Sequence, residues 1–538
     1  MKPINENVVF KVLSEGMSKK PVMQSLGCHV LYYAPPHPNP WGLTTTLLGV
    51  AARAARQVPR PDELLLAEFK QFCSDLQQEY FEPMPGDTKI CQDAWLETRP
   101  YTETRKLELA DKWSKCGKRL QPQHSINKCF MKDETYPEFK QARGIYSRSD
   151  EFKMFCGPWF SAIESRVFKN EHFIKYVPVT ERPGFITDRI FVPGAKYVTS
   201  DYTAFESHFT REMMEACEFQ LYEYMTQNIP GSIEFMDTIR QVIGGRNQCY
   251  FKNFKFSIDA TRMSGEMCTS LGNGWTNLCL MKFAAHKYGT ECKGVVEGDD
   301  GLFIFKDNIL PTADFFHQLG WTIKLEEHTQ LNTASFCGNV FDPDDGIVIT
   351  DPREVLLNFG WSKTPYVGAT RKRMLELLKS KSLSYAHQYR GCPIVQSLAN
   401  YGMRMTKRID LRRFLARNRT ISLWEKEQLL EALDHLEEIE QIPVPSNTRL
   451  LVEQLYGIAV DTQLQIEEYL DNLTELIPLS LPVFDQLFGA AHGTYWTHYV
   501  GSSKIEGIAP VARNTNMLRD VAEVTTMHRD LQRRGRTL

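Results

Sequence analysis

The stretch 293–305, KGVVEGDDGLFIF, decides the fold of the central part of the chain. Two apolar runs flank a turn that holds Gly298, Asp299, Asp300 and Gly301, which is the pattern of a β-hairpin. A tight turn uses one Asp and one Gly, so the second carboxylate needs another explanation. Mg²⁺ is held by hard oxygen ligands, commonly one or two carboxylates together with substrate phosphates. The hairpin therefore predicts a divalent-cation site as well as a pair of strands.

A second acid follows another predicted strand. Residues 190–200, IFVPGAKYVTS, read as extended, Asp201 comes next, and a helix is predicted over 205–226. If the strands are neighbours, Asp201 and Asp299 could share two ions about 4 Å apart. The alternative is that Gly-Asp-Asp-Gly is only a turn, and the triplet alone is a weak signal.

A helix predicted over 265–286 begins with a polar pattern. Residues 264–273 fit S-G-x-x-x-T-x-x-x-N, with Ser264 and Gly265 at the helix entry. Thr269 and Asn273 are four residues apart and share one face of the helix. Polar groups one turn apart on an otherwise apolar helix indicate a site. The alternative is an N-cap serine followed by a buried polar ladder.

Taken in order, these segments resemble motifs A, B and C of the RNA-dependent RNA polymerases of positive-strand RNA viruses. The string 263–273, MSGEMCTSLGN, is most similar to the tombusvirus-like branch, with nodavirus-like and flavivirus-like enzymes as neighbours. Three further segments agree. The residues Lys132-Asp133-Glu134, together with Arg143 and Arg148, resemble motif F. Residues 319–324 (LGWTIK) resemble motif D, and residues 336–338 (FCG) resemble motif E.

The resemblance implies an α+β fold of the right-hand polymerase type, with a small antiparallel palm sheet and mostly helical surroundings. The implied layout is 1–185 for an N-terminal extension and fingers (motif F at about 128–150), 186–225 for the palm with motif A, 226–258 for a fingers insertion, 259–375 for the palm with motifs B to E, and 376–538 for the thumb and C-terminal tail.

The resemblance also implies roles for single residues. Asp201, Asp299 and Asp300 would hold two Mg²⁺ ions, which Mn²⁺ could replace, and Lys324 would protonate the leaving pyrophosphate. The nucleotide would be bound by Lys132, Arg143, Arg148, Glu206, Ser264, Gly265, Thr269 and Asn273. Glu206 departs from the family, which usually has Asp there, so the ribose contact is expected to be reshaped.

The expected reaction is template-directed RNA synthesis from NTPs. Its partners would be an RNA template, the nascent strand, and other viral or host proteins that anchor the complex to membranes in the host cytoplasm. No helicase, protease or methyltransferase motif is present, so the chain is expected to be the polymerase alone. The alternatives are a catalytically impaired polymerase fold that binds RNA as a scaffold, for which Glu206 is the support, and a reverse transcriptase, which should lack the 264–273 pattern. A capsid protein would not need the clustered acids.

The composition agrees with a globular protein that confines its positive charge to particular segments. The 538 residues carry 63 Lys and Arg against 66 Asp and Glu, a net charge of −3, which argues against a histone-like nucleic-acid binder. Basic segments at 101–150, 401–420 and 511–538 are suited to binding a nucleic-acid backbone, and the acidic 421–441 offsets the second. The 13 cysteines form no C-x-x-C pair, which indicates a reducing compartment without a zinc cluster.

The apolar pattern of the sequence bears on contact with membranes. No run of 18 apolar residues exists, so no transmembrane helix is expected. The stretch 44–57 could form a basic amphipathic helix, for which a packed or solvated position is favoured over a membrane surface.

Overall fold

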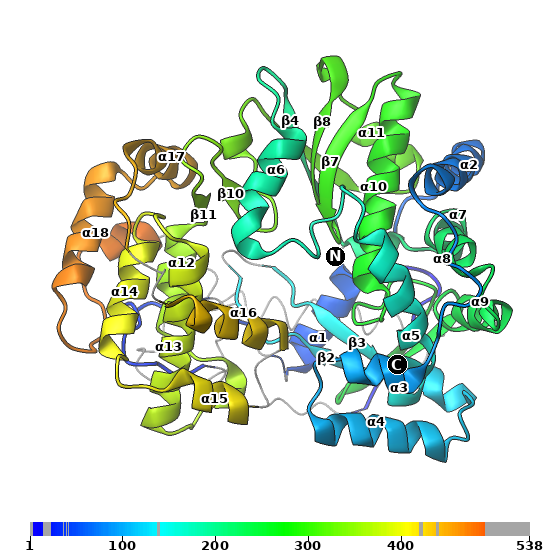
Figure 1. Ribbon diagram of the computed structural model, residues 1–538, viewed down its shortest axis with the longest axis horizontal. Coiled ribbons are helices and arrows are strands. Elements are labelled where there is room, and N and C mark those ends of the chain that lie inside the picture. Colours follow the sequence, from blue (N-terminus) through cyan, green and yellow to red (C-terminus); the bar gives the residue numbers. More distant parts are fainter. Residues whose placement is uncertain are drawn as a thin grey trace.

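The computed structural model describes residues 4–13, 23–35, 37–38, 40, 42–136, 140–418, 423–436 and 441–489. A four-stranded antiparallel sheet in the order β7-β8-β4-β9 lies at its centre (Figure 1). The strands are β4 (Tyr197–Tyr202), β7 (Cys292–Glu297), β8 (Asp300–Phe305) and β9 (Ile323–His328). The predicted hairpin is confirmed as β7 and β8, with Gly298 and Asp299 between them.

Both faces of β8 are buried, which explains why it reads as an apolar run, whereas the edge strand β9 carries exposed charged residues. On β8 the side chains alternate: Phe303 and Phe305 join one core, and Leu302 and Ile304 join another. Val296 and Val295 on β7 divide in the same way. This period of two is the strand geometry that the sequence pattern predicts.

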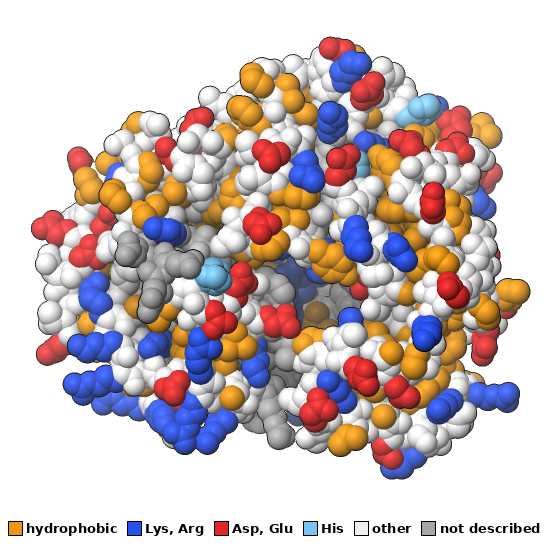
Figure 2. Space-filling view, in the orientation of Figure 1, with side chains coloured by type: hydrophobic (Ala, Val, Ile, Leu, Met, Phe, Trp, Pro, Cys, Tyr) orange, Lys and Arg blue, Asp and Glu red, His pale blue; other side chains and the backbone are white. Residues whose placement is uncertain are grey.

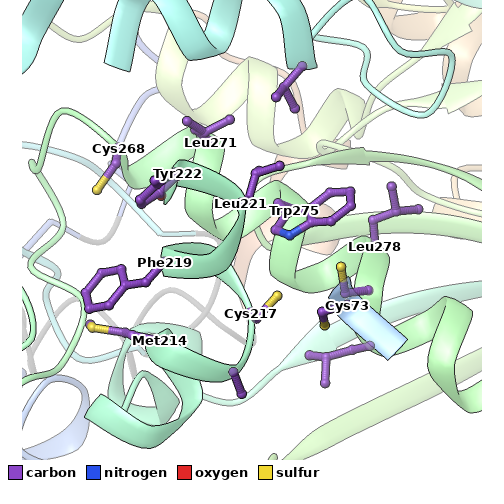
Figure 3. Packing of buried hydrophobic residues seen from close by; sticks show 14 of the residues in the cluster. Cys73, Met214, Cys217, Phe219, Leu221, Tyr222, Cys268, Leu271, Trp275 and Leu278 are labelled. Carbon is purple, nitrogen blue, oxygen red and sulfur yellow. The ribbon is translucent and has the colours of Figure 1, made fainter. Parts of the chain in front are cut away.

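Helices cover the first face and form the largest core of the described residues. Figure 3 shows part of this core, in which Trp275 and Leu278 lie beside Leu221 and Tyr222. The helices are α2 (Glu63–Tyr80), α5 (Asp150–Val167), α7 (Arg211–Ala216), α8 (Glu218–Thr226), α9 (Ser232–Val242), α10 (Thr269–Lys287) and α11 (Ala313–Gln318). Helix α6 (Arg182–Ile190) buries Ile186 and Ile190 in the core on the other face.

Three predicted elements need correction. The helix over 205–226 is a 3₁₀ turn, η3 (Phe205–His208), followed by α7 and α8, because Cys217 leaves helical geometry at φ −127° and ψ −80°. The extended run 190–200 starts later, since Ile190 still belongs to α6. Helix α10 starts at Thr269 and not at 265, because Gly265 has a φ of +128°, which no helix uses.

A second sheet gathers strands that are far apart in the sequence. Its order is β1-β6-β5-β2-β3, built from β1 (Val9–Val12), β2 (Asn127–Met131), β3 (Gly144–Arg148), β5 (Arg246–Tyr250) and β6 (Phe254–Asp259). Helix α1 (Leu43–Ala52) packs on it with Leu47, Val50 and Ala51 buried. The segment 44–57 thus includes a packed helix, and the weakly periodic segment after residue 128 includes two regular antiparallel strands.

The C-terminal part is helical and lies on the left in Figure 1. Its core also contains N-terminal residues, because Val30 forms a bridge with Leu479 and Leu26 is buried beside it. The elements are β10 (Val340–Phe341), β11 (Val348–Ile349), α12 (Pro352–Phe359), α13 (Arg371–Gln388), α14 (Val395–Met405), α15 (Leu411–Arg417), α16 (Leu423–Asp434), α17 (Ser446–Tyr456) and α18 (Val460–Asn472). On the other side of the molecule, α3 (Gln92–Thr98) and α4 (Glu103–Lys115) pack on α5.

Helices dominate, and the strands form small sheets that are mainly antiparallel, which confirms the predicted α+β class. The molecule is hollowed near the centre of one face, between the C-terminal helices and the elements around α5, and Lys and Arg side chains are visible in the hollow (Figure 2). None of the helices in the described ranges is long and apolar enough to cross a membrane. The basic segment 511–538 lies outside the described residues.

Candidate active site

The pairing of β4 with β8 brings Asp201 to the acids of the hairpin. Ser200 is opposite Gly301, so Asp201 at the end of β4 lies next to the turn that holds Asp299 and Asp300. The charge of Asp201 helps to raise the pKa of Asp300, which shows that the two carboxylates are close. The structure therefore brings together the three acids that the sequence singled out.

Like charges crowd at this point. Asp299 and Asp300 are exposed to solvent, yet many protein atoms surround their carboxylates. This partial burial, reinforced by the charges of Asp300 and Glu206, raises the pKa of Asp299 to about 6. Burial also raises the pKa of Asp300, and a hydrogen bond with the Cys337 thiol offsets part of that rise. A cluster of acids without equal positive charge is a site that a cation would stabilise.

The donor set fits a hard divalent cation. The three aspartates offer only carboxylate oxygens, which Mg²⁺ and Mn²⁺ prefer, and solvent contact leaves room for water and phosphate ligands. The carboxylate oxygens of the three aspartates do not all lie within 4.8 Å of one another. The one group of three ligand atoms that meets this distance in the described residues consists of thiols. Mutual repulsion accounts for the wider spacing of the acids.

That thiol group comprises Cys73, Cys217 and Cys279, two of which are labelled in the core in Figure 3. Burial raises the pKa of Cys73 and Cys279. At Cys217 hydrogen bonds from the other two thiols outweigh burial, and the pKa falls to about 6. The described residues add no fourth metal donor to the group. We interpret the trio as small side chains packed in the core.

Glu206 lies on η3, directly after Ala204 turns the chain at a φ of +53°. The Glu206 charge contributes to the raised pKa of Asp299, so the two side chains are close. The residue that departs from the family pattern thus belongs to the acid cluster.

The basic segment faces the acids through one arginine. Arg143, about half exposed, donates from Nε to Glu134 Oε1 at 2.5 Å and from Nη2 to Oε2 at 2.6 Å. Its charge lowers the pKa values of Asp299 and Asp300 in part. Lys132 Nζ lies 2.9 Å from Glu134 Oε2. Both basic groups are accessible beside the acid cluster and are held there by one carboxylate.

Arg148 does not fit its predicted role. Its side chain is 2% exposed and pairs with Glu266 at 2.6 Å, and it also donates to the carbonyls of Ser125 and Val242 and to Asn247. Every guanidinium nitrogen is occupied by protein, so none is available for a triphosphate. Arg148 instead fastens β3 to the segment that enters α10.

The entry to α10 presents backbone, as predicted. Tyr146 donates its backbone N–H to the carbonyl of Ser264 at 2.8 Å, which joins this segment to β3. A Cβ on Gly265 would lie 2.6 Å from the Tyr146 carbonyl oxygen, so only glycine fits this approach. Gly265 is exposed and Ser264 half-buried, so both remain accessible to a ligand.

Thr269 and Asn273 differ in their surroundings. Thr269 Oγ1 donates to the carbonyl of Glu266 at 3.0 Å, within its own turn. Asn273 is buried, at 8% exposed, and its Oδ1 accepts a hydrogen bond from Arg262 Nε at 3.0 Å. Arg262 was missed by the sequence analysis. Its signal was a lone arginine two residues before Ser264, with Asp259 and Glu266 as the nearest charged residues.

Asn277 was also missed, although it continues the ladder of Thr269 and Asn273 by one turn. Its Nδ2 donates to the carbonyls of Gly298 and Asp299, at 3.3 and 3.0 Å. Tyr202 donates its hydroxyl to Asn277 Oδ1 at 3.1 Å. Asn277 therefore fixes the turn of the hairpin to α10 and to the end of β4.

Lys324 is placed opposite Asp201 in the register of β9 with β4. Its side chain is exposed, and its ammonium group pairs with Glu326. That hydrogen bond, together with the charges of Glu326 and Asp201, raises the pKa of Lys324, so the amine stays protonated.

Comparisons with known proteins agree with this site. A family model described as viral RNA-dependent RNA polymerase matches residues 196–477, more than half of the chain, from β4 to the end of the described helices. The RNA-directed RNA polymerase of Panicum mosaic virus is 23% identical over 340 residues, which cover 60% of this chain and 31% of that protein.

Two further relatives carry the same name. The polymerase of Turnip crinkle virus is 28% identical over 154 residues (27% of this chain, 19% of that protein), and that of Atlantic halibut nervous necrosis virus is 24% identical over 267 residues (44% and 26%). The chain thus spans between 19 and 31% of the length of these three relatives. The predicted resemblance is confirmed, and the chain belongs to the family of viral RNA-dependent RNA polymerases.

Proposed function

We propose that the chain carries out template-directed RNA synthesis from NTPs. The observation that carries this proposal is the pairing of β4 with β8, which sets Asp201 beside Asp299 and Asp300. In the proposed reaction the 3′-hydroxyl of an RNA strand attacks the α-phosphate of an NTP, and pyrophosphate leaves. Such phosphoryl transfer depends mainly on positioning and on charge stabilisation, which this site is built to provide.

Asp201 and Asp299 would hold two Mg²⁺ ions, with Asp300 as the weaker ligand. When bound, the ions would activate the attacking oxygen and stabilise the leaving one. The raised pKa of Asp299 supports this assignment, because a group of crowded carboxylates gains most from a divalent cation. Asn277 acts through the backbone of the hairpin turn and is a positioning residue for Asp299.

Arg143 and Lys132 would neutralise the triphosphate by exchanging Glu134 for phosphate oxygens. Burial opposes ionisation of Glu134, yet hydrogen bonds led by that from Arg143 lower its pKa to about 2, so the carboxylate stays charged and keeps both basic side chains in place until the substrate arrives. Lys324, protonated and opposite Asp201, would donate the proton to pyrophosphate.

Glu206 and Asn273 would read the ribose, while Ser264, Gly265 and Thr269 would present backbone and hydroxyl groups to the nucleic-acid strand. Glu206 supports this role by its closeness to Asp299. Glutamate is one methylene longer than the usual aspartate and keeps the same acceptors, so we infer that selection for ribose persists with an altered contact.

The layout follows the same proposal. The central sheet would be the palm, and the five-stranded sheet, which unites segments near residues 10, 130, 145 and 250, would belong to the fingers. Helix α12 shares its core with the C-terminal helices, which supports a thumb that would begin near residue 350, where the layout expected from the sequence begins it at 376. We further propose replication of a positive-strand genome in the host cytoplasm, with membrane anchoring supplied by other viral or host proteins.

A template-directed extension assay tests the proposal. Purified protein is given an RNA template, four NTPs and either Mg²⁺, Mn²⁺ or EDTA, and incorporation is followed on a denaturing gel. We expect cation-dependent synthesis, and a loss of at least about a thousandfold in Asp299→Ala. Glu291→Gln, at the far end of the same hairpin, is the matched control and should retain full activity. Absence of incorporation by the wild type with either cation would favour the RNA-binding scaffold.

A further inference from the structure

Arg262 is a fully buried charge in the described part of the molecule. It lies between β6 and the entry of α10, and its side chain is 0% exposed. Burial opposes a charged guanidinium, and a compensating carboxylate is needed to keep it ionised. Glu218 at the start of α8, also 0% exposed, supplies that carboxylate. Burial lowers the pKa of Arg262, but the charge and hydrogen bond of Glu218, together with the contributions of Cys268 and Tyr222, raise it overall.

The hydrogen bonds of this pair lead to two residues of the proposed site. Arg262 Nη2 donates to Glu218 Oε1, Nη1 to Cys268 Sγ at 3.2 Å, and Nε to Asn273 Oδ1 at 3.0 Å. The backbone N–H of Arg262 donates to the carbonyl of Glu206 at 3.0 Å. A single buried residue therefore contacts the side chain of Asn273 and the backbone of Glu206, the two residues that would read the ribose.

The contact with Asn273 has a chemical consequence. An arginine has only donors, so the atom of Asn273 that faces it must be the carbonyl oxygen Oδ1. The amide is thereby fixed in one of its two orientations, and the Nδ2 group is left on the other side. Within the described residues, the hydrogen bond of the Asn273 side chain is the one that Oδ1 accepts, and Nδ2 donates to no protein acceptor. It is therefore a donor in a fixed position, matched to an acceptor such as the oxygen of a 2′-hydroxyl.

The surroundings hold Arg262 in turn. Its Cζ lies 4.4 Å from the centre of the Phe209 ring, and Tyr222 donates its hydroxyl to Glu218 Oε2 at 2.7 Å. Helix α10 comes so close that a Cβ on Gly272 would lie 2.2 Å from Glu218 Oε2 and 2.5 Å from Arg262 Nη2. Glycine costs helix stability, and here it permits the ion pair to touch the turn that carries Asn273.

We propose that Arg262, paired with Glu218, is the positioning residue that makes the polymerase select ribonucleotides over 2′-deoxyribonucleotides, by fixing the donor of Asn273 and the chain at Glu206. The inference rests on the proposed function. A merely structural pair would affect folding and overall rate, whereas a positioning pair affects the ratio between two substrates that differ by one hydroxyl.

The test compares kcat/KM for an NTP and for the matching 2′-dNTP in the extension assay. Arg262→Lys keeps the charge but lacks the planar set of donors that bonds Glu218 and Asn273 together. We expect it to lower the NTP-to-dNTP ratio by about tenfold, the worth of one hydrogen bond, through loss on the NTP only. Asn273→Ala should lower the ratio equally, and the double variant should add nothing further.

Two other variants complete the design. Gly272→Ala pushes a methyl group against the pair and should lower the ratio although Arg262 and Glu218 are both retained. Arg449→Lys alters a second enclosed arginine, bonded to Glu467 at 2.7 Å in the C-terminal helices away from Asn273, and should leave the ratio unchanged. Thermal unfolding of each variant establishes that it is folded, and Gly272→Ala decides the question if Arg262→Lys does not fold.

The outcomes separate the two levels of the argument. No incorporation of NTP by the wild type would overturn the proposed function itself. An active wild type, with an unchanged ratio in folded Arg262→Lys and Gly272→Ala, would overturn the positioning role alone. An equal fall of the ratio in Arg449→Lys would also overturn it, because selectivity would then follow general destabilisation.

Discussion

Helix α10 contacts two groups of charged residues, one turn apart, through Asn273 and Asn277. The two groups differ in solvent exposure and in the balance of charge. Asn277 holds the hairpin that carries Asp299 and Asp300, where the acids touch solvent and lack equal positive charge. One turn earlier, Asn273 contacts Arg262, whose pairing with Glu218 is closed to solvent. The open group, Asp299 and Asp300, is crowded with like charge. The closed group, Arg262 with Glu218, is neutral as a pair.

The difference separates binding from positioning. Crowded carboxylates destabilise the fold that contains them, so their retention indicates a ligand that offsets the repulsion. A buried ion pair is tolerated only when its hydrogen bonds are complete, and complete hydrogen bonds fix geometry. We therefore expect changes in the open group to alter cation binding, and changes in the closed group to alter shape and stability.

Breaking the closed pair should have the largest effect on stability. Glu218→Leu leaves Arg262 charged and unpaired in the core, which costs about 3–5 kcal/mol of unfolding free energy. Adding Arg262→Met should restore most of the loss, because no buried charge then remains. Chemical denaturation followed by circular dichroism measures both variants. A loss below about 1 kcal/mol in Glu218→Leu would show that water reaches the pair, and the contrast between the two groups would fail.

The sequence predicted the strands and acids well because both depend on local pattern. The hairpin of β7 and β8 and the buried strand before Asp201 follow from apolar runs with turn residues between them. The break of the expected helix 205–226 at Cys217 was missed, since no glycine or proline marks it and tertiary packing sets it. The entry of α10 at Gly265 shows the same limit, because a positive φ ends helical geometry without any change of composition.

The two arginines of the site region show what a sequence cannot give. Arg148 was assigned to the nucleotide from the resemblance of its segment to motif F, and Arg262 was passed over because it stands alone. The structure buries both, each against a glutamate distant in sequence: Glu266 for Arg148 and Glu218 for Arg262. Charge density along a chain does not reveal where a guanidinium points, since that depends on contacts between distant segments.

The charged segments of the C-terminal half also show that contacts in space decide the role of a charge. The basic segment 401–420 and the acidic segment 421–441 meet in space, because Arg412 of α15 pairs with Asp434 of α16 at 2.5 Å. Helix α16 buries Leu429 and Ala432 against neighbouring helices, so it is packed and not merely solvated. Part of the basic charge that was predicted to bind a nucleic-acid backbone is therefore already neutralised within the protein.

A smaller effect on stability is expected when charge is removed from the open group. The folded pKa of Asp299, about 6, exceeds its unfolded value of 3.8, so the folded state binds the proton more tightly. Stability should therefore fall as pH rises through the window from about 4 to 6 in EDTA, and Asp299→Asn should lose that slope. Because the carboxylate touches solvent and faces Asp300, Glu206 and Arg143, we expect a gain of about 1 kcal/mol or less in metal-free Asp299→Asn above pH 6.

Thermal unfolding against pH measures this effect, and added Mg²⁺ sharpens it. The ion should raise the midpoint of the wild type and not that of Asp299→Asn, because the variant lacks a ligand. Asp259→Asn, an exposed acid paired with Arg246 in the five-stranded sheet, serves as the control that keeps the Mg²⁺ response. Equal responses in the wild type and in Asp299→Asn would mean that the open group does not bind the cation.

Lys324 should show the least effect on stability. It tests whether a residue beside the open group can act in the reaction without contributing to the fold. It lies opposite Asp201 but is exposed and paired only with Glu326, so Lys324→Ala should leave the unfolding midpoint unchanged. If its raised pKa keeps a proton ready for pyrophosphate, the same variant should slow incorporation by about a hundredfold. Glu326→Gln releases the amine without removing it and should keep activity. Wild-type incorporation by Lys324→Ala would make this lysine a solvated charge, and the chemistry would then rest on the carboxylates and Arg143.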